Sequence, residues 1–197
     1  AEAHLERALQ RSHLRGMAVG EPVFATLPDE LLADLDAGAA AAARARELGD
    51  DSGELFRIEA ALASQRITGL ASALKWGRAV ERALAAAAER SPDDPRLHIA
   101  LGLRELLAPK LLGHDPAAAL ERFGYAANAL DDERPAIFAA MAAWLLERRM
   151  QAIEWLERAV ATNPQNGFAR VVLARLRRGE EQPFGRDITP AELAAGR

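Results

Sequence analysis

The four histidines are the side chains best suited to bind a metal or move protons, and their spacing argues against a metal site. Two histidines that hold one ion from a single helix lie three or four residues apart. His4, His13, His98 and His114 lack that spacing. The chain has no cysteine, which excludes a disulfide, a thiolate zinc site and a cysteine nucleophile. We therefore expect no metal.

The common motifs for nucleophilic catalysis and phosphate binding are absent as well. No serine lies in a Gly-x-Ser-x-Gly elbow, and neither Gly-x-x-x-x-Gly-Lys-Ser/Thr nor Gly-x-Gly-x-x-Gly occurs. The adjacent carboxylates of Glu180 and Glu181 lie among loop-forming residues, where solvation is the simpler interpretation. The sequence thus predicts a protein that is not an enzyme and has no cofactor.

Charge and hydropathy exclude two further classes. A formal net charge of −4 and a pI near 5.7 provide no concentrated basic face, so nucleic acid is not an expected partner. No apolar run approaches the roughly 18 residues that a membrane-spanning helix needs, so membrane insertion is not expected. The chain begins at Ala1, which leaves open whether a signal peptide was removed or the chain was shortened. Both a periplasmic and a cytoplasmic location therefore remain open.

The elements that position the side chains are predicted to be helices. Alanine exceeds a fifth of the residues, and leucine, glutamate and arginine are abundant, all of which lose little side-chain freedom in a helix. Residues that favour strands are scarce and do not alternate with polar ones. The composition predicts an all-α fold.

A helix from Ala152 to Val160, closed by Asn163 and Pro164, resembles the second helix of a hairpin in the tetratricopeptide repeat (TPR) family. In that family small residues let the two helices approach, a bulky apolar residue fills the gap, and a proline follows the helix. These positions are matched by Ala152, Leu156, Ala159 and Pro164. Ala140 matches the small position of the preceding helix, whose start is indicated by Asp132, Glu133 and Pro135.

The resemblance extends in both directions along the chain. An earlier unit begins at Pro95, with Gly102 at its small position and Ala119, Phe123 and Ala126 in its second helix. A later helix, Gly167–Arg178, carries Leu173 and Ala174 at family positions and is interpreted as a capping helix. The resemblance implies a right-handed superhelical array of antiparallel hairpins with about 8–10 helices in all.

The remaining segments are interpreted from breakers and caps. We expect helices at about 3–17, 28–48, 54–67 and 70–89, separated by glycine- and proline-containing turns. Thr189, Pro190 and Glu192 resemble a helix start in a tail that folds back onto the array. The predicted organisation is one domain over residues 1–197, with N-terminal helices (1–53), hairpins and capping helix (54–178) and tail (179–197).

One connection departs from the family pattern. Residues 108–116 are about five residues longer than the usual TPR turn and carry Lys110, His114 and Asp115. They are either a binding loop or a packing insertion in which Leu111 and Leu112 are buried against the next hairpin. Packing is the favoured interpretation.

The family's binding face implies the candidate site. In TPR proteins, set positions on each first helix line a concave groove. Here they correspond to Arg96, Ile99, Leu103, Leu106 and Leu107; to Arg134, Ile137, Met141, Trp144 and Leu145; and to Phe168, Val171, Arg175 and Arg178. The implied groove has an apolar floor and a basic end, which suits an apolar helix or an extended peptide with an acidic end.

Two functions follow from the resemblance. The first is a non-enzymatic interaction module or adaptor that binds a protein or peptide in this groove. The second is a periplasmic protein that binds a small ligand or assists a transporter, which would need a closed cavity around Trp144 and Met141. A third possibility is that the groove residues are covered by the chain's own N-terminal helices or by a second copy in a homo-oligomer.

Overall fold

The computed structural model describes residues 1–13, 27–184 and 188–195. Within these ranges the chain forms ten α-helices and one short 3₁₀ helix, and no strand occurs in them. The all-α class predicted from composition is confirmed. The chain divides into two compact units, Ala1–Ala100 and Leu101–Arg197, and the boundary falls inside helix α5 (Pro95–Leu107). The single domain expected from the sequence stays a prediction.

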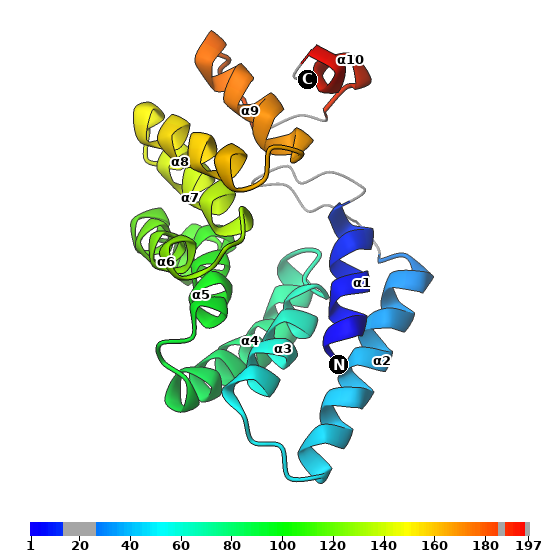
Figure 1. Cartoon of the computed structure of the whole chain (residues 1–197). Coiled ribbons are helices and arrows are strands. Elements are labelled where there is room, and N and C mark those ends of the chain that lie inside the picture. Colours follow the sequence, from blue (N-terminus) through cyan, green and yellow to red (C-terminus); the bar gives the residue numbers. More distant parts are fainter. Residues whose placement is uncertain (14–26, 185–187, 196–197) are drawn as a thin grey trace. The chain divides into compact units, whose positions relative to one another are not determined.

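The first unit contains the N-terminal helices α1 (Glu2–His13), α2 (Asp29–Glu47), α3 (Gly53–Ser64) and α4 (Leu70–Arg90). Helix α3 packs against α1, α2 and α4, and α1 packs against α2 (Figure 1). One apolar cluster of this unit is formed by the first three helices and consists of Leu5, Ala8, Leu31, Leu35, Ile58 and Leu62.

The second unit carries the end of α5, the 3₁₀ helix η1 (Lys110–Leu112), and five further helices. These are α6 (Pro116–Ala129), α7 (Arg134–Leu145), α8 (Arg149–Thr162), α9 (Gly167–Arg178) and α10 (Pro190–Ala195). Each of α6 to α8 packs against the next helix in the chain, so α6 to α9 follow one another as a stack in Figure 1. Helix α10 packs against α9.

Small and bulky residues meet between these helices. A Cβ added at Gly102 of α5 would lie 2.7 Å from Cε1 of Phe123 in α6, so only glycine permits this approach. The small and bulky positions matched to repeats are buried in the same way: Ala119, Phe123, Ala126, Ala140, Ala152, Leu156 and Ala159.

The helix ends follow local side-chain chemistry. Asp115 precedes α6 and accepts hydrogen bonds from the backbone N–H groups of Ala117 and Ala118, at 3.1 and 3.0 Å. Asn166 accepts from Ala169 N–H at the start of α9, and Gly179 ends that helix with φ of 84°, which glycine adopts without strain. Helix α9 has the predicted bounds. The expected helix 3–17 is α1 as far as His13, and its last residues lie outside the described ranges.

Candidate functional site

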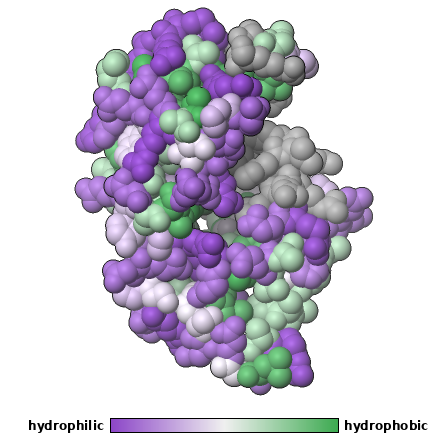
Figure 2. All heavy atoms as spheres, viewed as in Figure 1, coloured by the Kyte–Doolittle hydropathy of each residue, from purple (hydrophilic) through white to green (hydrophobic). Residues whose placement is uncertain are grey.

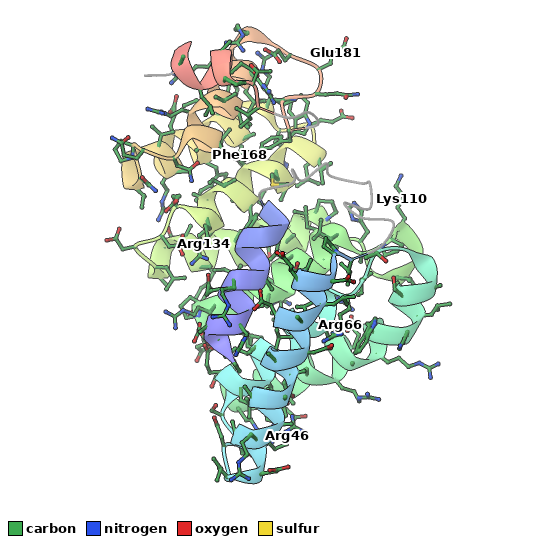
Figure 3. The ribbon with its side chains drawn as sticks, turned by 90° about the vertical axis from the view of Figure 1, so that its right-hand side faces the viewer. Arg46, Arg66, Lys110, Arg134, Phe168 and Glu181 are labelled. Carbon is green, nitrogen blue, oxygen red and sulfur yellow. The ribbon has the colours of Figure 1, made fainter. Side chains whose placement is uncertain are left out.

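The residues predicted to line a groove lie on three helices. Arg96 and Ile99 belong to the first unit, whereas Leu103 and the positions on α7 and α9 belong to the second. A single groove that includes all of them therefore stays a prediction. Among the predicted groove residues of the second unit, Arg134 of α7 and Phe168 of α9 are labelled in Figure 3.

Most of the predicted apolar floor is buried inside the chain, although Leu107 is 50% exposed. Ile137, Met141 and Val171 are all in the core, as is Leu106. The side chains that remain accessible lie at the ends of the two helices. Phe168, at the start of α9, is 37% exposed, and Trp144, near the end of α7, is half-buried. Leu145, next to Trp144 at the end of α7, is 39% exposed as well.

Three predicted groove arginines of the second unit pair with carboxylates of the same chain. Arg134 forms a two-pronged contact with Asp132, with its Nη2 at 2.6 Å from Oδ2. Arg178 donates from Nη2 to Glu180 at 2.7 Å. Both pairs are solvent-exposed, so each contributes little to stability and is open to exchange. The predicted basic end is thus locally neutralised.

Arg175 differs from the other two because its side chain is completely buried, at 0% exposure. Its Nε and Nη2 donate to the two carboxylate oxygens of Glu192 in α10, at 2.8 and 3.0 Å, and its Nη1 donates to the carbonyl of Pro183 at 3.1 Å. Such fork-to-fork pairs are among the strongest hydrogen-bonded contacts in proteins. A partner's carboxylate would have to displace Glu192 to reach this guanidinium.

Helix α10 presents Glu192 through a capping box. Thr189 Oγ1 accepts from the backbone N–H of Glu192 at 3.3 Å, and the Glu192 carboxylate accepts from the backbone N–H of Thr189 at 3.0 Å. The Arg175 guanidinium, followed by the backbone N–H of Thr189, holds the pKa of Glu192 well below its usual range. The predicted helix start is confirmed, and the tail contacts α9 as expected.

The long connection between α5 and α6 is tied to the hairpin by its ends. The backbone N–H of Asp115 donates to the carbonyl of Glu105, whose carboxylate binds Arg122 at 2.8 Å. The expected burial of Leu112 is wrong, because its side chain is 53% exposed at the end of η1. The Leu111 side chain lies outside the described residues, and Lys110 is exposed (Figure 3).

Three further findings on the described residues concern depressions, metal-binding groups and membrane-spanning helices. A shallow depression on α2 and α3 is lined by Ala43, Arg46, Glu47 and Glu59, and an ion pair between Arg46 and Glu59 crosses it. Within the described ranges no group of histidine, aspartate and glutamate is arranged to hold a metal ion. None of the helices described is both long enough and apolar enough to cross a membrane.

Comparisons with known proteins add no family assignment. No protein-family model matches the chain, and no curated protein or solved structure matches it either.

Proposed function

We propose that the chain is a TPR-like interaction module that binds a protein or peptide and catalyses no reaction. Its hairpins would form a right-handed superhelical array. Support comes from the packing of each helix in the stack against the next, and from the complete burial of small residues opposite bulky ones, as at Gly102 and Phe123. An array of this kind presents the same side of successive helices to a partner.

The observation that carries the proposal is the exposure of aromatic side chains on α7 and α9. Buried aromatics provide much of the energy of protein interfaces, and Phe168 and Trp144 retain accessible surface in the free chain. Burying such a side chain fully contributes roughly 1.5–3 kcal/mol, so two anchors offset a useful part of the cost of association. Figure 2 shows that hydrophilic residues cover much of the visible face, with small apolar areas between them.

The partner that suits this surface combines apolar anchors with carboxylates. Arg134, at the start of α7, and Arg178, at the end of α9, are exposed, and each already binds a carboxylate of the same chain. Because exposed ion pairs are weak, exchange of Asp132 or Glu180 for a partner's carboxylate costs little.

Affinity capture from a lysate of the source organism tests the proposal. The full chain is compared with a variant carrying Trp144→Ala and Phe168→Ala, and with a control carrying Tyr125→Ala and Met150→Ala, which removes exposed side chains of α6 and α8 instead. We expect a protein that is retained by the chain and by the control but lost by the first variant. Circular dichroism establishes that both variants are folded.

Two results contradict the proposal. Equal retention by all three proteins would exclude the face formed by α7 and α9. If no specific protein is retained by any of them, the alternative of a small ligand or of self-association takes its place. Phe168→Ala alone repeats the comparison should the double variant unfold, since Phe168 is the more exposed of the two.

A further inference from the structure

We propose that the surface of α9 around Arg175 and Gly167 is an exchangeable binding site for a helix-starting acidic segment of a partner protein, and that the chain's own tail occupies this site in the free protein. The inference rests on the proposed function and names the chemistry of its partner. The partner's chemistry is inferred from the contacts that the tail of this chain makes with the site.

The acidic residue is the first element of recognition. With the tail in place the Arg175 guanidinium is fully buried, and the two carboxylate oxygens of Glu192 accept hydrogen bonds from its Nε and Nη2. An arginine at this depth requires a carboxylate, because an uncompensated buried charge is strongly destabilising. Glu180 approaches Arg175 as well, but its carboxylate is 4.0 Å from Nε, so Glu192 is the principal partner.

The second element is a leucine that follows the acidic residue. A Cβ added at Gly167 would lie 2.7 Å from Cδ2 of Leu193, so the missing side chain at the start of α9 makes room for this leucine. Leu193 keeps 38% of its surface exposed, which shows that the contact is a surface contact rather than part of the core. The carboxylate and the leucine together fix the direction of the bound helix.

The short length and partial exposure of α10 allow another segment to replace it at Arg175. Helix α10 has six residues, which is too short for a stable helix in isolation, and it begins with a capping box and with Pro190 in the first turn. Ala191 and Ala194 are exposed. Its covalent attachment supplies a high local concentration, so the tail stays on Arg175 until a segment that binds more tightly competes with it.

The site therefore fits a partner segment with threonine or serine at the helix start, an acidic residue three positions later, and leucine directly after it. The proposal can be tested with the full chain and one pair of peptides. The probe is the acetylated and amidated octapeptide of residues 188–195, and its control carries glutamine in place of Glu192. Binding is followed by NMR on isotope-labelled protein, using the backbone amides of α9.

The receptor proteins are the full chain and its Glu192→Gln variant. Glutamine retains the capping box, so α10 can still form, while the charge that holds Arg175 is lost. Losing a hydrogen bond to a charged group costs enough to weaken the tail's hold about ten-fold or more. We expect the glutamate peptide to bind the Glu192→Gln variant about ten-fold more tightly than it binds the unchanged chain, and about ten-fold more tightly than the glutamine peptide binds that variant.

Three results would overturn the inference. If the folded Glu192→Gln variant binds neither peptide, the tail is a permanent part of the structure. If the two peptides bind that variant equally, the carboxylate is not recognised. A concentration-dependent dimer of the unchanged chain that the substitution abolishes would assign the site to a second copy instead of a different protein.

These outcomes are separate from those of the capture experiment. Should the peptides fail while capture still depends on Trp144 and Phe168, the interaction module stands without an exchangeable tail. If the peptides bind but capture does not depend on those aromatics, the exchangeable site at Arg175 is supported and the binding surface on α7 and α9 is contradicted.

Discussion

At the scale of single residues, Gly102 of α5 leaves no room for a side chain beside the Phe123 ring of α6. The Phe123 ring is completely buried and its centroid also lies 5.4 Å from the ring centroid of Phe138 in α7. It is therefore held on two sides and cannot easily turn away from an added methyl group. Two helices approach closely because one residue has no side chain and the other fills the resulting space.

The substitution Gly102→Ala tests this contact. Alanine raises helix propensity by up to about 1 kcal/mol, but overlap with a fixed ring costs roughly 1–3 kcal/mol, so we expect net destabilisation. Urea unfolding measures the change. Adding Phe123→Leu to the alanine variant should recover part of the loss, as the smaller side chain yields space. A Gly102→Ala chain more stable than the original would show that the ring moves freely.

The sequence predicts packing positions better than it predicts ion pairs between distant residues. Small and bulky packing positions such as Ala140 and Leu156 are predictable because their spacing along a helix decides which residues meet. The pairing of Arg175 with Glu192 is not predictable from the sequence. The family pattern assigns Arg175 to the binding of a partner instead. The capping box at Glu192 is a local signal, whereas the position of its carboxylate depends on how the tail packs against α9.

At the scale of elements, helix bounds are predictable where prolines, glycines and capping side chains interrupt the chain. Asn166 and Gly179 delimit α9 at the expected residues. The connection before α6 is less predictable. Its leucines indicate burial by type alone, yet Leu112 is exposed, because burial depends on the path of the backbone rather than on hydrophobicity.

Asp115 offers a test of how this connection stabilises α6. Its carboxylate accepts two backbone N–H groups that would otherwise be unsatisfied, so Asp115→Ala should lower the free energy of unfolding by about 1 kcal/mol. Asp115→Asn should be nearly neutral, and Leu112→Ser should change stability by less than about 0.5 kcal/mol because Leu112 is exposed. Denaturant titration compares the three. A larger loss for Leu112→Ser than for Asp115→Ala would contradict this assignment.

Glu133 links the start of α7 to the turn between α8 and α9. Its Oε1 accepts from the side-chain amides of Asn163 and Asn166, at 2.9 and 3.0 Å. Burial alone would raise the pKa of Glu133, but these donors stabilise the ionised carboxylate more strongly, and the pKa is lowered from its ordinary 4.5. The ionised form therefore stabilises the folded chain.

A pH dependence follows from the direction of this shift. Because the pKa of Glu133 is lower in the folded chain, its contribution is complete above the ordinary value of 4.5 and is lost as the pH falls below it. Glu133→Gln keeps one acceptor oxygen but loses the charge, so it should cost roughly 1 kcal/mol at neutral pH. The difference between the two chains should shrink in acid when unfolding is measured from about pH 7 to about pH 3. A difference that is constant with pH would contradict the role of the charge.

At the scale of the whole molecule, the sequence predicts an apolar groove floor, of which Ile137, Met141 and Val171 lie in the core while Leu107 and Leu145 are exposed. The positions are assigned from a family pattern, which states which side of a helix a residue lies on. It does not state how much of that side neighbouring segments cover. Ile137 and Met141 are buried for this reason, whereas Phe168 and Trp144 remain accessible near helix ends.

Site-specific photo-cross-linking tests the central claim most directly, because it captures a partner whatever that partner's identity. A benzoylphenylalanine replaces Phe168 on α9 in one chain and Met150 on α8 in another; both positions are exposed, Met150 at 68%. We predict a discrete cross-linked protein from position 168 and none from position 150 after irradiation in a lysate of the source organism. Adducts from position 150 alone, or equal adducts from both, would contradict binding through α7 and α9.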